Sequence, residues 1–227
     1  MPNSSNRSDT SNTPGIRYDP EPRWPAILAL LAVGGLHLAL PDALTVGPSW
    51  LLIVAVAVLM VPTVIARHRG YFTASQIIGY AVLILVTVAL VWSLWRLIAA
   101  LPGHVEAPRD LLRSATVLWV SNILVFASWY WRLDAGGPYA RERRDTHKDG
   151  AFLFPQMTIP AAKLPEGQRR WSPEFVDYLF LAFNTSTAFS PTDVPILSRW
   201  AKLLMMTQST ISFATVALLA ARAVNIL

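Results

Sequence analysis

Long apolar stretches with few charged residues constrain this chain more than any other feature of its sequence. A helix needs roughly 20 apolar residues to cross a bilayer, and the first 133 residues hold four stretches near that length. Hydrophobic residues make up 53% of the 227 positions and charged residues only 15%, a balance that soluble domains do not show. We therefore predict an all-α integral membrane protein. The four predicted spans are 24–40, 50–66, 77–100 and 111–133.

Two polar segments frame these spans. Residues 1–23 are rich in Ser, Asn, Thr, Asp and Pro, and we expect them to form a disordered tail. Residues 134–173 form a basic, proline-rich loop between the four-helix region 24–133 and the C-terminal region 174–227. Its Phe-Leu-Phe triplet at 152–154 is expected to dock either on the bilayer surface or on the helices.

Composition and motifs exclude several classes of function. The chain has no cysteine, which excludes disulfides, thiolate metal sites and thiol nucleophiles. Its formal net charge is +5, but the basic residues lie in loops beside apolar spans, where they set membrane topology. The sequence holds no nucleophile–base pair, metal-spaced cluster or phosphate-binding loop. We therefore predict no enzyme activity, no cofactor or metal and no nucleic-acid partner, and we expect the lipid bilayer to be the main partner.

The C-terminal region departs from the pattern of simple spans. The apolar run 175–183 is about nine residues long, too short to cross a bilayer, and four polar residues follow it directly. Pro195, a residue favoured in a first helical turn, then opens an apolar helix that extends to the C-terminus. Non-helical backbone at membrane depth is tolerated only where protein buries it or where it lines a wet cavity. This order predicts a re-entrant, pore-type half-helix before a fifth transmembrane helix.

The segment from Thr185 to Asp193 resembles the filter of potassium channels, whose pattern is T-x-T-T-V-G-Y-G-D. Thr185 and Thr187 fall on two threonines of that pattern and Asp193 on its aspartate, without gaps. The span from Phe152 to the C-terminus also resembles an uncharacterised bacterial membrane family, the domain of unknown function 1345, which implies no activity. Its motifs correspond here to Asp177-Tyr178-Leu179-Phe180, to Thr187 with Asp193-Val194, and to Ala223-Val224-Asn225.

The filter-like segment lacks the two glycines of the potassium pattern. Ser190 and Thr192 occupy their places, and Pro191 occupies the place of the tyrosine. A potassium filter presents stacked backbone carbonyls to the ion, and glycine permits the backbone angles that this requires. Proline fixes φ near −65° and has no N–H. We therefore expect a pore-loop unit that is weakly selective or non-conducting.

Ten polar residues are candidates for lining a pore. Those before Pro195 could instead bond back to the carbonyls of the short helix, and those in the last helix could instead form interhelical hydrogen bonds. The sequence leaves these alternatives open. Asp193 has a further role as the expected N-cap of the helix that opens at Pro195. The candidates are Asn184, Thr185, Ser186, Thr187, Ser190, Thr192, Asp193, Gln208, Ser212 and Thr215.

Basic residues in the loops indicate the orientation. The side that holds the N-terminus, residues 67–76 and residues 134–173 has twelve Lys and Arg, and the other side has only Arg109 and Arg113. The positive-inside rule places the N-terminus in the cytoplasm, and the family resemblance implies a bacterial inner membrane. A potassium channel would place the 134–173 loop outside. Either the half-helix enters from the cytoplasmic face, or 175–194 crosses fully as a sixth span.

Three functions remain in competition. The leading hypothesis is a channel-like protein, and the resemblance to a pore unit implies a homo-tetramer and monovalent cations as partners. The second is a non-conducting scaffold or accessory subunit that keeps the pore fold only as packing. The third is a small-solute transporter, although the internal repeats common in transporters are not visible in the sequence.

Overall fold

The computed structural model describes residues 21–100, 108–142, 150–160, 163, 171–188 and 193–224, and these residues form an all-α fold without a named strand. Four helices are long and apolar enough to cross a membrane, consistent with a multi-pass membrane protein. They are α2 (Leu51–His68), α3 (Phe72–Ala100), α4 (Pro108–Leu133) and α8 (Arg199–Val224). The predictions of 50–66, 77–100 and 111–133 are thus confirmed as helices, with boundaries that differ by a few residues.

The first helix, α1 (Trp24–His37), is apolar but shorter than the others. It packs against α2 where Gly34 lies, because a Cβ there would stand 2.9 Å from the Ile53 Cα. Backbone–backbone hydrogen bonds continue the turn through Leu40. A short 3-10 helix, η1 (Asp42–Leu44), then leads toward α2.

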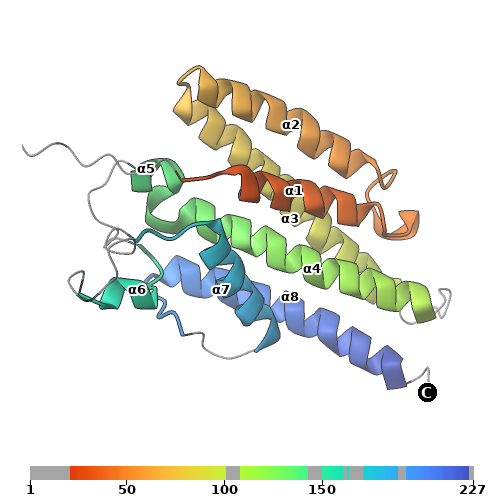
Figure 1. Cartoon of the computed structure of the whole chain (residues 1–227). Coiled ribbons are helices and arrows are strands. Elements are labelled where there is room, and N and C mark those ends of the chain that lie inside the picture. Colours follow the sequence, from red (N-terminus) through yellow and green to blue (C-terminus); the bar gives the residue numbers. More distant parts are fainter. Residues whose placement is uncertain are drawn as a thin grey trace, which may run out of the picture.

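The helices form one bundle in which α4 occupies a central position. Figure 1 shows α1, α2, α3, α4 and α8 running side by side, with α7 (Phe175–Thr187) lying obliquely across α4 and α8. The buried core includes Val56, Val86 and Val125 from α2, α3 and α4. Large apolar side chains on the outer faces are exposed, as lipid contact requires; among them are Val58, Val88, Met206 and Phe213.

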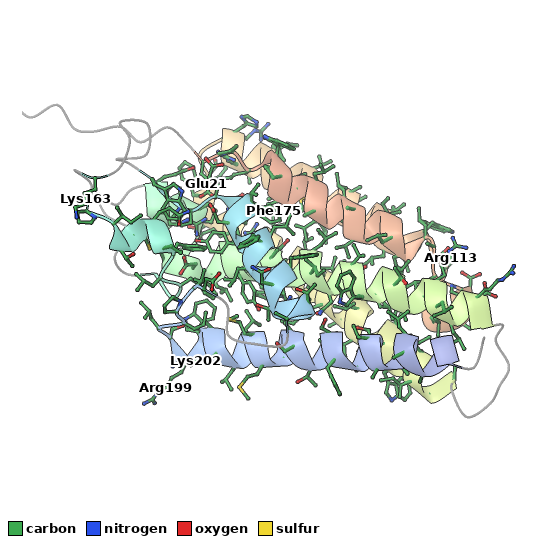
Figure 2. All side chains as sticks on the ribbon, turned by 60° about the horizontal axis from the view of Figure 1, so that its bottom comes forward. Glu21, Arg113, Lys163, Phe175, Arg199 and Lys202 are labelled. Carbon is green, nitrogen blue, oxygen red and sulfur yellow. The ribbon has the colours of Figure 1, made fainter. Side chains whose placement is uncertain are left out.

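The connection between α4 and α7 folds onto one end of the bundle. It contains η3 (Asp134–Gly136), α5 (Pro138–Glu142) and α6 (Pro155–Thr158). Phe152 and Phe154 are both buried, and their rings pack against Tyr130 and Tyr178. The triplet 152–154 therefore docks on the helices, which is one of the two places expected from the sequence. Figure 2 shows Lys163, Arg199 and Lys202 near this end, and Arg113 at the opposite end.

The helix α8 begins at Arg199, so the prediction that Asp193 caps a helix starting at Pro195 is wrong. Residues 195–197 instead pair with 151–153 through an isolated antiparallel bridge between Phe152 and Ile196. The Leu153 N–H donates to the Pro195 carbonyl at 3.0 Å. Ser198 takes the capping role, because its Oγ accepts the Ala201 N–H at 3.3 Å.

Residues 21–23, which the sequence places in the polar tail, are held against the bundle. The Arg23 guanidinium pairs with the Glu142 carboxylate at 2.9 Å, and the Glu21 N–H donates to the same carboxylate at 3.1 Å. Long-range charge pairs of this kind leave no local pattern in the sequence. The remainder of the predicted tail, residues 1–20, lies outside the described residues.

Candidate functional site

A cluster of buried polar side chains lies between α4, α7 and α8, and it holds several of the sequence-predicted pore residues. Gln208 is fully buried at its centre. Its Nε2 donates to the Ala182 carbonyl at 2.7 Å and to the Ser186 Oγ at 2.8 Å, and its Oε1 accepts from the Tyr130 hydroxyl. We call this group the α4–α7–α8 cluster; its members are Trp119, Asn122, Tyr130, Ser186, Gln208 and Ser212.

Side chains of α8 supply donors to two carbonyls at the C-terminal end of α7. The last four carbonyls of a helix have no partner within it, and they need donors wherever water is absent. The Ser212 hydroxyl of α8 donates to the Ser186 carbonyl at 2.8 Å, and the Ser209 hydroxyl lies 3.5 Å from the Thr185 carbonyl. The Trp119 indole of α4 in turn donates to the Ser212 Oγ at 3.1 Å. The polar groups of α8 thus complete the end of a neighbouring helix.

Three threonines among the candidates bond within their own helix. The Thr185 hydroxyl donates to the Leu181 carbonyl at 2.8 Å, and the Thr187 hydroxyl to the Phe183 carbonyl at 3.0 Å. In α8, the Thr215 hydroxyl donates to the Ser212 carbonyl at 2.8 Å. The bonds of Thr185 and Thr187 correspond to the back-bonding alternative that the sequence left open. The bonds of Thr215 stay within α8, so they are not the interhelical bonds that were the alternative for the last helix.

The ten pore candidates therefore fall into three groups. Thr185, Ser186, Gln208, Ser212 and Thr215 are buried, each at most 3% exposed. Asn184 is half-buried, and Thr187 and Asp193 are exposed. Ser190 and Thr192 lie outside the described residues. Pore lining by any of the ten stays a prediction.

A second polar network at the loop end of the bundle joins parts far apart in the sequence. The Asp134 carboxylate accepts the Tyr178 hydroxyl at 2.7 Å and the Ala151 N–H at 2.5 Å. The Arg141 guanidinium donates to the Trp131 and Asp134 carbonyls at 2.8 and 2.9 Å. This network fixes the start of α7 and the 150–154 segment on the end of α4.

Glu21 extends this network to the N-terminal side. Its carboxylate pairs with the Arg141 guanidinium at 2.9 Å and also accepts the Trp131 indole N–H. Burial raises the pKa of Glu21 above its ordinary value, and the Arg141 guanidinium and the indole hydrogen bond offset part of that effect. The charge pair is almost fully enclosed, with side-chain exposures of 2% for Arg141 and 9% for Glu21.

The start of α7 has the capping arrangement that suits a helix end near an interface. The Glu174 N–H donates to the Asp177 Oδ2 at 2.8 Å, and the Glu174 side chain accepts from the backbone of the first turn. Glu174 and Asp177 thus form a capping box at the N-terminus of α7. Among the described residues, no three His, Cys, Asp or Glu side chains are grouped closely enough to hold a metal ion.

Sequence reasoning missed Tyr130, Asp134 and Tyr178 as members of polar networks. Tyr130 reads as one of several aromatic residues in an interface belt, and Asp134 reads as the first residue of a loop. The available signal was chemical: a buried hydroxyl or carboxylate beside an apolar span needs a partner. The identity of that partner is not local, since 44 residues separate Asp134 from Tyr178.

No protein-family model matches the chain, and the comparisons with curated proteins and with solved structures find no match.

Proposed function

We propose that the protein is a channel-like membrane protein whose pore-loop unit packs the fold and does not conduct ions. The observation that supports this most directly is the burial of Ser186, Gln208 and Ser212 inside one chain. Residues that line a pore between subunits would be open on the surface of a single subunit. Here their hydrogen bonds are used within the chain, to α4 and to the end of α7. This favours the scaffold or accessory-subunit form of the hypothesis.

The proposal includes five transmembrane helices, α1 to α4 and α8, and a re-entrant α7. With 13 residues, α7 is roughly 20 Å long, shorter than the ~30 Å bilayer core. Both α7 and α8 start at the same end of the bundle. Near the start of α7, Tyr178 bonds to Asp134, and Asp134 bonds to Ala151. The segment beside Ala151 pairs with residues 195–197, which directly precede α8. A chain that enters by α7 and returns to that end before α8 is re-entrant, which argues against a sixth span.

Flux measurements in liposomes test the proposal. The purified protein is reconstituted at known density, and potassium and sodium fluxes are recorded against protein-free vesicles and against vesicles with gramicidin. We expect neither cation to move faster than in protein-free vesicles. Flux of either cation that rises with protein density and falls on Ser186→Val would show that the cluster lines a conduction path.

A weakly selective cation channel is the second candidate, and a separate observation favours it. Thr187 at the end of α7 is exposed, as is Asp193, and the C-terminal end of a helix favours cations. An assembly could bring these groups of several subunits together. Two results together would support this candidate: a tetramer in native mass spectrometry, and cation flux that Thr187→Val abolishes and Thr207→Val keeps. If native mass spectrometry shows only monomers, the scaffold hypothesis is the one that stands.

The charge rule is the basis for the proposed orientation, in which the N-terminus and the 134–173 loop lie in the cytoplasm. The family resemblance implies that the membrane is a bacterial inner membrane. Because the chain has no native cysteine, an introduced one is the only thiol. Lys163→Cys and Val46→Cys place it in exposed residues of the 134–173 loop and of the loop between α1 and α2. We expect an impermeant thiol reagent to label only the Val46 position in intact cells. Labelling only at the Lys163 position reverses the orientation.

A further inference from the structure

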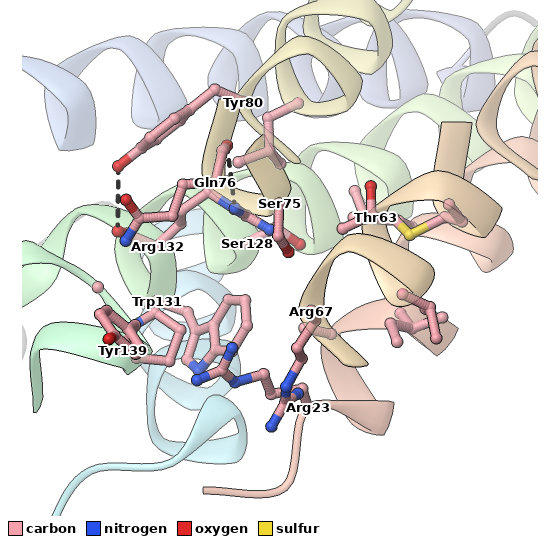
Figure 3. A pocket seen from close by; sticks show the side chains of 18 of the residues that line it. Arg23, Thr63, Arg67, Ser75, Gln76, Tyr80, Ser128, Trp131, Arg132 and Tyr139 are labelled. Carbon is pink, nitrogen blue, oxygen red and sulfur yellow. Dashed lines mark hydrogen bonds between the residues drawn. The ribbon is translucent and has the colours of Figure 1, made fainter. Parts of the chain in front are cut away.

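A cavity of about 650 Å³ lies among α1, α2, α3 and α4, away from the α4–α7–α8 cluster. It opens at the end of the bundle where α1 and α3 begin and where α2 and α4 finish. Figure 3 shows Arg23 and Arg67 together on one side of this cavity, with Arg132 across from them beside Tyr80 and Gln76. We call this cavity the basic pocket. None of the described residues that line it is acidic.

The positive charges of the basic pocket are incompletely neutralised. Among the described residues, Arg67 and Arg132 form no ion pair. Arg132 donates a single long hydrogen bond, 3.5 Å, to the Gln76 carbonyl. Arg23 pairs with Glu142, but its Nε is buried without a hydrogen-bond partner. The charge of Arg23 also repels those of Arg67 and Arg132, and the Glu142 carboxylate offsets part of this repulsion at Arg67. Of the three arginines only Arg23 has an ion-paired carboxylate among the described residues, and this excess of positive charge favours an anion between them.

Arg132 is held in place by its surroundings. Its guanidinium lies over the Tyr80 ring at 5.5 Å and near the Trp131 ring at 5.8 Å, contacts that stabilise a cation. It passes beside Gly79 of α3, where even a Cβ would collide with the guanidinium. The missing side chain at Gly79 therefore gives Arg132 room to reach the pocket. Such placement preorganises the charge before any ligand binds.

The pocket combines this charged part with an apolar part deeper in the bundle. Leu30, Met60 and Leu83 line the deeper part, and Ile27 and Val64 continue it toward the opening. Trp24 at the opening is 66% exposed, as expected for a residue at the level of lipid headgroups. A ligand that matches the whole pocket must carry a negative group at headgroup level and hydrocarbon below it.

We propose that the basic pocket binds an anionic phospholipid of the surrounding leaflet, with the phosphate between Arg23, Arg67 and Arg132. The acyl chains follow the apolar part of the pocket between the helices. The charge rule places this end of the bundle at the cytoplasmic leaflet, where anionic lipids attract basic residues. Basic pockets between transmembrane helices on that side are suited to such headgroups. The site is independent of whether the protein conducts.

Native mass spectrometry tests the site. The full chain is released from vesicles of equal phosphatidylglycerol and phosphatidylcholine, and retained lipid is identified. We expect one phosphatidylglycerol to be retained by the wild type. The double variant Arg67→Gln/Arg132→Gln should bind it on the order of tenfold more weakly. Ser75→Trp, which fills the pocket opening and keeps every charge, should also lose the lipid.

The matched control is Arg69→Gln/Arg199→Gln, which removes two exposed charges at the same end but outside the pocket. This control should retain phosphatidylglycerol like the wild type, and all variants should keep the wild-type melting temperature within a few degrees. Equal retention by the pocket variants and the control overturns the proposal. Complete competition by millimolar glycerol phosphate also overturns it, because the site would then recognise a soluble anion without acyl chains.

Discussion

The α4–α7–α8 cluster and the basic pocket both take residues from α4, but their polar groups are partnered differently. In the cluster, the Gln208 amide uses both its nitrogen and its oxygen in bonds within the chain, and among the cluster's members only the Asn122 Oδ1 is buried without a partner in the described residues. In the pocket, Arg67 and Arg132 have no acidic partner among the described residues. Since a polar group without a partner is costly in lipid, a saturated group suggests packing, and an unsaturated one suggests a ligand. Ser186, from the segment that resembles a channel filter, falls in the first class.

The largest effect is expected at the network that borders both regions. Arg141→Met removes the partner of the buried Glu21 carboxylate and the donor to the Trp131 and Asp134 carbonyls. Removing one member of a buried ion pair costs about 3–5 kcal/mol. We expect a loss of that size in the free energy of unfolding in mixed micelles. Arg199→Met, at an exposed position, serves as the control, and an equal loss there would contradict the role of the network.

A smaller loss is expected within the cluster. Gln208→Leu leaves the Tyr130 hydroxyl without its acceptor and the Ser186 hydroxyl without its donor. Leaving buried polar groups unpaired costs about 2 kcal/mol in the free energy of unfolding. Thr207→Val is the matched control, because Thr207 is exposed and bonds only to the Leu203 carbonyl of its own helix. If both variants unfold alike, the cluster does not stabilise the fold.

The pH dependence of Glu21 gives a third, weaker effect. Its pKa is raised above the ordinary 4.5 in the folded chain, so the folded chain holds this proton more tightly than the unfolded one. The stability that this proton contributes is present below about pH 4.5 and is lost as pH rises through the raised pKa. Glu21→Gln cannot titrate, so the wild type should lose stability relative to Glu21→Gln as the pH rises above about 4.5. Melting curves of both proteins measure this change, and a wild type that gains stability relative to the variant with rising pH would contradict the shift.

The smallest effect on stability is expected in the basic pocket. Arg132→Gln removes a charge that has no ion-pair partner among the described residues. In micelles of zwitterionic lipid the loss of its two cation–π contacts should lower the free energy of unfolding by about 1 kcal/mol. Added phosphatidylglycerol should then stabilise the wild type more than the variant. A large loss without anionic lipid would place Arg132 with the structural groups of the cluster.

The membrane-spanning helices were predictable because their evidence is local. Apolar runs of sufficient length indicate α2, α3, α4 and α8. In α2, residues 51–61 are all apolar. The capping residues Glu174 and Asp177 lie three apart and mark the start of α7 for the same reason. The start of α8 was placed too early because the pairing of 195–197 with 151–153 depends on residues more than 40 positions away.

The partners of polar side chains were less predictable than their positions. The sequence identifies Gln208, Ser212 and Thr215 as polar residues within a span. Residues that line a pore and residues that bond to another helix occur at the same spacing along one helix, so the pattern does not separate the two roles. The outcome for Gln208 depends on Tyr130 and Ala182, which belong to other helices. Arg132 and Arg67 are typical interface anchors by sequence. They differ from Arg141 in that neither forms an ion pair with a described carboxylate.

The termination of α7 against α8 has a consequence for the order in which the chain is assembled. The ribosome makes α7 before α8, and α7 then lacks the donors that Ser212 and Gln208 supply to its last turns. In the proposed re-entrant arrangement, the Ser186 carbonyl has no donor within α7 and must stay in contact with water or with the insertion machinery until α8 has been inserted. We therefore expect a nascent chain arrested before residue 199 to hold α7 at the translocon.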